Sequence, residues 1–164
     1  MDIASLQKMA PQGFVNSSLR SQVWPLLVDN KLSLHHEYRK DYYTKGIIKH
    51  QYWEQVRKDV PRSMFSYDIT ASMSEDERNI QREKLQRVMD AVLSKNPDLH
   101  YVQGYHDICS VFLLVCGEKK AFSLMETLSK TKIKDMHRDD HLQVIIAVLD
   151  LLVPVLKLAD PEVK

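Results

Sequence analysis

The chain contains 164 residues, a length that suits one domain with a hydrophobic core of its own. Its 23 basic and 22 acidic side chains leave a formal net charge of +1. This balance argues against nucleic acid as a partner, because proteins that bind phosphate backbones carry a basic excess.

The cysteines and the N-terminus indicate the compartment. Cys109 and Cys116 are two helical turns apart, about 10 Å, which is too far for a disulfide between them. We therefore expect reduced core thiols of a cytosolic protein. The N-terminus lacks the basic and apolar regions of a secretory signal. No apolar run reaches the roughly 20 residues that a bilayer requires, so no transmembrane segment is predicted.

Helical spacing of apolar residues predicts the first two elements. A short helix is expected over residues 3–9 and ends at the breaker cluster Pro11-Gln12-Gly13. A second helix follows, with Ser17 or Ser18 as its N-cap. Its buried face is expected to carry Leu19, Val23, Trp24 and Leu27. Pro25 predicts a kink or a restart, because an internal proline removes a hydrogen bond at a cost of about 3 kcal/mol.

The next segment, residues 32–43, is charged and rich in tyrosine, and it is predicted to be helical up to Gly46. A further amphipathic helix is expected to end at Pro61, since the residue before a proline avoids the α region. Its apolar positions are Ile48, Tyr52, Trp53, Val56 and Val60. Arg62 is therefore expected on the loop that follows, and residues 63–72, which lack an apolar period, are expected to be irregular.

Strong local signals mark two helices in the second half of the chain. Ser74 and Glu77 form a capping box, the start of a helix that ends at Asn96-Pro97. Residues 108–115 are apolar on nearly every side and predict a central helix that is buried all round. Gly117 suits the C′ position of that helix.

Two more helices complete the prediction. Residues 121–128 and 142–156 show helical periodicity, and the second helix is expected to bend at Pro154. No stretch alternates apolar and polar residues as a strand does. The predicted fold is therefore all-α, with many short and irregularly connected helices.

The candidate chemistry lies in two loops. Arg62, three residues after Asp59, is either a solvated surface arginine or an arginine finger that enters another protein's phosphate site. Gln103 lies beside the flexible Gly104 in a loop whose tyrosines anchor it to the core. It is either a hydrogen-bonding rim residue or a group that positions the attacking water in GTP hydrolysis, since an amide both donates and accepts.

Other chemistries have weaker support. His137 and His141 are spaced i, i+4, which can bind zinc, but no third ligand is evident and a polar helix start is the simpler explanation. The composition is compatible with a Ser/His/Asp catalytic triad. No nucleophile elbow, Walker A loop, paired Cys-x-x-Cys or dinucleotide fingerprint occurs, so we expect no cofactor or metal of the chain's own.

Three short motifs follow one another along the chain. They are Arg20-Ser21-Gln22-Val23-Trp24, Val56-Arg57-Lys58-Asp59-Val60-Pro61-Arg62 and Tyr101-Val102-Gln103-Gly104. In this order they resemble the R-x-x-x-W, I-x-x-D-x-x-R and Y-x-Q-G motifs of the TBC domain, the catalytic module of GTPase-activating proteins for Rab GTPases. The one departure within them is Val56 in place of isoleucine, a conservative core change. The flanking Asn96-Pro97 and Tyr105-His106-Asp107 are most similar to the branch of that family that acts on early secretory Rabs.

The resemblance implies a multi-helical TBC domain and a dual-finger mechanism. Arg62 would neutralise charge on the γ-phosphate, Asp59 would hold the Arg62 loop, and Gln103 would position water in place of the GTPase's own glutamine. By analogy with arginine fingers, these residues would lower the barrier by about 4 to 7 kcal/mol. Supporting roles are implied for Arg20, Trp24, Tyr101, Gly104 and Asp107. The chain would not be an enzyme itself, because the GTP-loaded Rab brings the GTP and Mg²⁺.

The resemblance also bears on the extent of the domain. Residues 1–12 are expected to be an extension and residues 13–164 a C-terminally truncated TBC core. The apolar face of residues 142–156 would then lack its cover, which predicts marginal stability, aggregation or a partner chain. The expected location is the cytoplasm, peripheral on endoplasmic reticulum or Golgi membranes through partners or a missing tail. The alternatives are a non-catalytic Rab-binding or scaffold protein, and a metal-dependent hydrolase built on His137 and His141.

Overall fold

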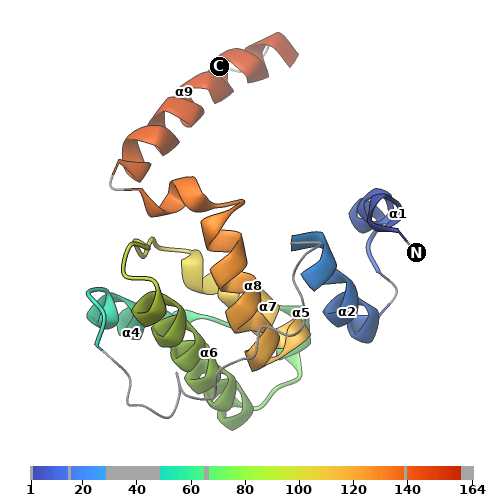
Figure 1. Cartoon of the computed structure of the whole chain (residues 1–164), viewed down its shortest axis with the longest axis vertical. Coiled ribbons are helices and arrows are strands. Elements are labelled where there is room, and N and C mark those ends of the chain that lie inside the picture. The colour runs from blue at the N-terminus through green and yellow to red at the C-terminus, as the bar shows by residue number, and fades with distance from the viewer. Residues whose placement is uncertain (1, 15, 29–48, 65–66, 139, 160–164) are drawn as a thin grey trace.

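The computed structural model describes residues 2–14, 16–28, 49–64, 67–138 and 140–159 (Figure 1). Its helices and 3-10 turns are α1 (Ile3–Met9), η1 (Ala10–Gln12), α2 (Ser17–Val28), α4 (Trp53–Asp59), η2 (Val60–Arg62), α5 (Asp68–Ala71), α6 (Glu75–Lys95), α7 (Tyr105–Cys116), α8 (Glu118–Lys130), η3 (Lys134–His137) and α9 (His141–Ala159). No strand occurs within these ranges, and the predicted all-α fold is confirmed. The helix predicted over residues 32–43 lies outside the described residues.

The hydrophobic core lies between α6, α7 and α8, which pack against one another in pairs. Its centre is a set of fully buried α6 side chains: Leu85, Val88, Met89 and Val92. Burial of a side chain of this size contributes about 1.5–3 kcal/mol. The segment α4–η2 packs on α6. Because α6 contacts both α4–η2 and α7, it holds together the two parts of the chain that carry the candidate site residues.

Local capping fixes where α6 begins and ends. The Ser74 hydroxyl accepts a hydrogen bond from the Glu77 amide at 3.2 Å, and the Glu77 carboxylate accepts one from the Ser74 amide at 2.7 Å. At the other end, the Asn96 amide donates to the Val92 carbonyl at 3.1 Å and closes the last turn. The capping box and the helix end at Asn96-Pro97 are thus confirmed.

The start of α2 differs from the prediction. Ser17 and Ser18 lie inside the helix, and the cap is Asn16, whose side-chain oxygen accepts from the Leu19 amide at 2.8 Å. An asparagine oxygen reaches the amide three residues later as well as a serine does, so the neighbouring serines were a misleading signal. Leu19, predicted to be buried, is 38% exposed.

The helix α2 is continuous through Pro25, so of the two predicted outcomes, a kink or a restart, the restart is wrong. Proline has no N–H, so it leaves the carbonyl four residues earlier, that of Ser21, without its helical donor. Lys120 of α8 replaces that donor, with 2.9 Å between Nζ and the Ser21 oxygen. A tertiary contact therefore compensates the hydrogen bond that the proline removes.

The segment around Pro61 is more helical than predicted. The helix α4 begins only at Trp53, and the proline lies at the start of η2, where its missing N–H is not needed. Arg62 therefore ends a 3-10 turn and is not on an open loop. Residues 63–72 were predicted to be irregular, but they include the short helix α5.

The helix α7 begins three residues before the predicted run and is not buried all round. Its buried residues lie on one face, at Tyr105, His106, Cys109, Ser110 and Leu113. The apolar composition of its other face misled the prediction, since composition does not report which side a neighbour covers. Gly117 ends the helix at φ +79°, as predicted, and its amide donates to the Leu113 carbonyl at 2.9 Å.

The remaining helices match their predictions in position. The helix α8 covers residues 121–128, while α9 covers 142–156 and contains Pro154. Figure 1 shows α9 leading away from the packed helices, and its large apolar side chains, such as Leu151 at 66%, are exposed. Cys109 and Cys116 are free thiols. Within the described ranges, no helix combines the length and apolarity needed to span a bilayer.

Candidate functional site

Arg62 is positioned by the tight junction between α4 and η2. Asp59 ends α4 with its side chain 1% exposed, and the 3-10 turn places Arg62 three residues later with its side chain 69% exposed. A guanidinium nitrogen of Arg62 forms an ion pair with Asp59, and its Nε donates to the Lys58 carbonyl at 3.2 Å. Arg62 is thus held at the surface by its own turn while most of its side chain faces solvent.

Asp59 is the buried acceptor at the centre of this arrangement. Besides Arg62, it accepts hydrogen bonds from Gln55 Nε2 at 2.9 Å and from the Tyr101 hydroxyl at 2.8 Å. Burial alone would raise the pKa of Asp59, but these hydrogen bonds and the nearby His106 outweigh it and leave the pKa below its usual value. Asp59 is therefore an ionised anchor at neutral pH.

Tyr101 joins the Arg62 turn to the loop that carries Gln103. Its ring is buried, and burial together with the Asp59 hydrogen bond raises the pKa of its hydroxyl, which stays protonated. Two residues later, Gln103 is exposed in a turn. Gly104 follows at φ +94°, a left-handed conformation that favours glycine, and α7 begins at the next residue. The structure thus presents Gln103 beside a fixed point, Tyr101, that also contacts the anchor of Arg62.

The first turn of α7 closes the site on its other side. The oxygen of the Tyr101 hydroxyl lies 2.8 Å from His106 Nδ1, and His106 Nε2 lies 3.5 Å from a carboxylate oxygen of Asp107. The Asp107 backbone carbonyl accepts from the Tyr67 hydroxyl at 3.4 Å. The chain of contacts therefore runs from Arg62 through Asp59, Tyr101 and His106 to Asp107.

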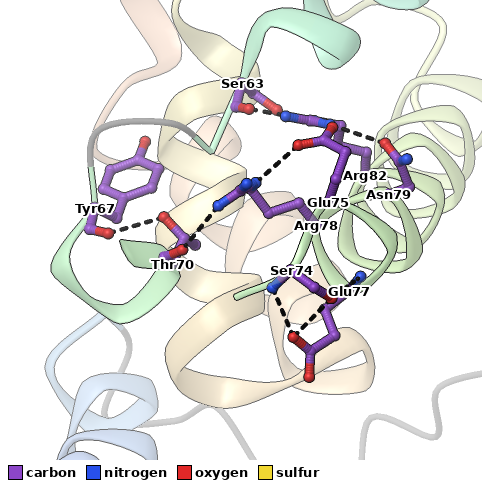
Figure 2. A network of polar contacts seen from close by, with 9 residues as sticks. All are labelled: Ser63, Tyr67, Thr70, Ser74, Glu75, Glu77, Arg78, Asn79 and Arg82. Carbon is purple, nitrogen blue, oxygen red and sulfur yellow. Dashed lines mark hydrogen bonds and ion pairs between the residues drawn. The ribbon is translucent and has the colours of Figure 1, made fainter. Parts of the chain in front are cut away.

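A second polar network, shown in Figure 2, ties the segment after Arg62 to the start of α6. The buried Arg82 donates from Nε to the Ser63 carbonyl at 3.4 Å, and its Nη1 lies 2.6 Å from Glu75 Oε1 and 2.8 Å from Asn79 Oδ1. Met64, the next residue, is buried at φ +66°, a conformation that is strained for a side chain other than glycine. Arg82 thus holds the chain in the sharp bend that directly follows Arg62.

The predicted site residues therefore fall into two groups. Arg62 and Tyr101 each contact Asp59 directly; Gln103 and Gly104 follow in the Tyr101 loop, and Asp107 joins the group through His106. Arg20 and Trp24 lie on α2, where Arg20 donates to the Phe14 carbonyl at 3.0 Å and Trp24 packs edge-on against Phe112 of α7, with 6.1 Å between ring centroids. These two contacts hold α2 in place and do not involve the loops of Arg62 and Gln103.

Sequence reasoning missed three residues of the arrangement. Gln55 could have been found from its i, i+4 spacing to Asp59, which places both on one face of α4. His106 was noted only within the run Tyr105-His106-Asp107, and Arg82 was not singled out. The Arg82 contact with the Ser63 carbonyl spans 19 residues, and the His106 contact with Tyr101 crosses the turn before α7, so no helical or strand spacing identifies either of them.

The histidine pair gains no further support as a metal site. His137 is buried, its Nδ1 lies 2.6 Å from the His100 carbonyl, and its ring packs edge-on against Tyr105. The His141 side chain lies outside the described part of the chain. Among the described side chains, no group of three or more His, Cys, Asp or Glu is placed to hold a metal ion.

Known proteins with similar sequences point to one family. Residues 17–164 match the family described as RabGAP-TBC, Rab-GTPase-TBC domain. TBC1 domain family member 20 of Mus musculus is 36% identical over 165 residues, 99% of this chain and 39% of that relative. The Homo sapiens protein of the same name is 33% identical over 171 residues, 98% of this chain and 39% of its own length. GTPase-activating protein gyp10 of Schizosaccharomyces pombe is 29% identical over 164 residues, 98% of this chain and 42% of its own. The chain thus spans about two fifths of the length of these relatives.

Proposed function

The chain belongs to the Rab-GTPase-TBC domain family, and from this premise we propose that it activates GTP hydrolysis by a Rab GTPase. The observation that carries the proposal is the contact of the Tyr101 hydroxyl with Asp59, which joins the turn of Arg62 to the loop of Gln103. The side chains of Arg62 and Gln103 are both exposed. The protein acts as an activator that supplies residues in trans, and the partner brings GTP and Mg²⁺.

Arg62 has the chemistry of an arginine finger. Its guanidinium is charged at every physiological pH and offers several planar donors, which suit the oxygens of a γ-phosphoryl group in the transition state. The ion pair with Asp59 leaves most of the side chain in solvent, so a partner's nucleotide can reach the remaining donors. In this mechanism Asp59 positions the arginine and does not itself touch the nucleotide.

Gln103 has the chemistry of a residue that positions water. Its amide can donate to a phosphate oxygen and accept from the attacking water at the same time. The buried Tyr101 fixes one side of its loop, and α7, which begins directly after the left-handed Gly104, fixes the other. The side chain is thereby displayed from a constrained backbone, as a positioning group requires.

The partner is proposed to be an early secretory Rab, which places the protein in vesicle traffic between the endoplasmic reticulum and the Golgi. This part of the proposal rests on the resemblance of Tyr105-His106-Asp107 to the branch of the family that acts on such Rabs. It is supported by the similarity to TBC1 domain family member 20 over nearly the whole chain.

The test is single-turnover GTP hydrolysis by a panel of GTP-loaded Rabs, with the full-length protein in excess. We expect Arg62→Ala to lower the acceleration by about 10³-fold and Gln103→Ala by about 10²-fold. Arg57→Ala is the matched control for the arginine, because Arg57 is exposed on α4, the helix that leads into the turn of Arg62, and stacks on Trp53 at 4.1 Å from the ring centroid. Gln12→Ala, at an exposed position of η1, is the control for the glutamine.

Two outcomes would contradict the proposal. A folded wild type that accelerates no Rab of the panel would exclude the activity. Acceleration that survives Arg62→Ala and Gln103→Ala unchanged would exclude the dual-finger mechanism. Capture of a GTP-loaded Rab without acceleration would favour the alternative, a Rab-binding or scaffold protein.

A further inference from the structure

We propose that His106 is a positioning residue that carries a proton on Nδ1 and donates it to the Tyr101 oxygen, which directs the Tyr101 hydroxyl at Asp59. The inference rests on the proposed function, because it assigns His106 the task of fixing Gln103 relative to Arg62. His106 itself touches neither finger.

The direction of the hydrogen bonds follows from a count of protons. The Tyr101 oxygen lies 2.8 Å from Asp59 Oδ2 and 2.8 Å from His106 Nδ1, but the hydroxyl has a single proton to donate. An ionised carboxylate can only accept, so that proton is donated to Asp59. The second contact must then run from His106 to Tyr101, which requires a proton on Nδ1. Both the neutral Nδ1–H tautomer and the imidazolium satisfy this requirement.

The surroundings of the His106 ring hold it in one orientation. It is buried in the first turn of α7, and it stacks on the Tyr101 ring with an interplanar angle of 27° and 6.2 Å between centroids. The backbone carbonyl of His106 accepts from the Ser110 hydroxyl at 2.9 Å, which ties the residue to the next turn of the helix. Its Nε2 faces the Asp107 carboxylate at 3.5 Å. These contacts fix Nδ1 toward Tyr101.

The bond between Tyr101 and His106 closes the loop that displays Gln103. The two residues are five positions apart, and Gln103 and Gly104 lie between them. One end of the closed loop is continuous with the rigid helix α7, and the other is bonded to Asp59, the residue that holds Arg62. A change at His106 would therefore move Gln103 relative to Arg62 without removing either side chain.

The kinetic test compares two substitutions in the full-length protein, with a Rab that the wild type activates. His106→Asn places an amide N–H near the position of Nδ1, so we expect kcat within about threefold of the wild type. His106→Leu has a similar volume but no donor, so we expect kcat to fall by about 10- to 100-fold with a smaller change in KM. Tyr101→Phe combined with His106→Leu should be no worse than Tyr101→Phe alone, since His106 acts through Tyr101.

An asparagine variant as impaired as the leucine variant, or additive effects of the double substitution, would overturn the positioning role. A second measurement does not depend on activity. Nitrogen-15 NMR of the wild-type imidazoles, with the His106 signals assigned by their loss in His106→Asn, is expected to show Nδ1 protonated. An unprotonated Nδ1 would overturn the proposal even if the protein activates a Rab. A wild type that activates no Rab would instead overturn the proposed function, while the NMR result still decides the direction of the bond.

Discussion

Replacing Asp59 with asparagine tests whether this buried carboxylate is the anchor of the site. In the wild type, Oδ1 pairs with Arg62, and Oδ2 accepts from Gln55 and Tyr101. An asparagine has one acceptor oxygen and one NH₂ group, so in either orientation its NH₂ meets a donor. The substitution therefore removes at least one charge-assisted hydrogen bond and leaves donors facing each other in a buried place.

The magnitude follows from these contacts. A hydrogen bond to a charged group contributes about 1.5–3 kcal/mol, and an unsatisfied buried donor costs about 1–3 kcal/mol. The ion pair adds about 1 kcal/mol or less, because the Arg62 side chain is 69% exposed and screened by solvent. We expect Asp59→Asn to lower the free energy of unfolding by about 2–4 kcal/mol at pH 7. Urea denaturation should show this as a lower midpoint with an unchanged m-value.

The effect of Asp59→Asn on stability is also expected to depend on pH. Because the folded pKa of Asp59 lies below its value of 3.8 in the unfolded chain, its stabilisation is fully present above about pH 4. This stabilisation is lost as the pH falls through the folded pKa of Asp59. The difference in free energy of unfolding between the wild type and Asp59→Asn should therefore become smaller in acid. The exposed Asp98→Asn is the matched control and should show no such difference. A difference in free energy of unfolding below about 0.5 kcal/mol between the wild type and Asp59→Asn at pH 7, or a difference that persists in acid, would refute the reasoning.

Two further predictions concern the backbone. Lys120→Met should lower the free energy of unfolding by about 1 kcal/mol, because it removes the donor at 2.9 Å from the Ser21 carbonyl. In a Pro25→Ala background the helix supplies its own N–H to that carbonyl, so the same substitution should have less effect in urea denaturation. An equal effect in both backgrounds would contradict the compensation. Gly104→Ala should destabilise the protein by about 1–2 kcal/mol through its φ of +94° alone, since an added Cβ meets nothing within 4 Å. We also expect it to slow activation of a Rab by displacing Gln103, and a variant with unchanged stability and activity would show that the left-handed turn is not required.

Helices whose ends carry local capping signals were predictable from the sequence. Ser74, Glu77, Asn96 and Gly117 act through hydrogen bonds or dihedral angles within a few residues of themselves, and their helices begin or end where expected. Some errors are also local, since the Asn16 cap of α2 was missed although its partner is three residues away. Others arise where a distant neighbour decides the outcome. The continuity of α2 at Pro25 is accompanied by a contact with α8, and the half-buried face of α7 is set by which helices lie beside it.

In the candidate site, too, contacts set by local spacing were predictable and contacts between distant segments were not. The proximity of Arg62 to Asp59 follows from a spacing of three residues in a turn. The bond between Asp59 and Tyr101 joins residues that are 42 positions apart, and only the resemblance of two motifs to one family suggested that they act together. The contact of His106 with Tyr101 depends on the register of α7 against the loop before it, which no periodicity in the chain encodes.

The short turn that holds Arg62 also has a consequence for the energetics of association. A free arginine side chain carries about 2 kcal/mol of rotamer entropy, which is forfeited when a partner immobilises it. Here the bonds to Asp59 and the Lys58 carbonyl already restrict the side chain before any partner arrives. Arg62 is thus preorganised, and more of the contact energy that it gains in a partner's nucleotide site remains available for binding or for the transition state.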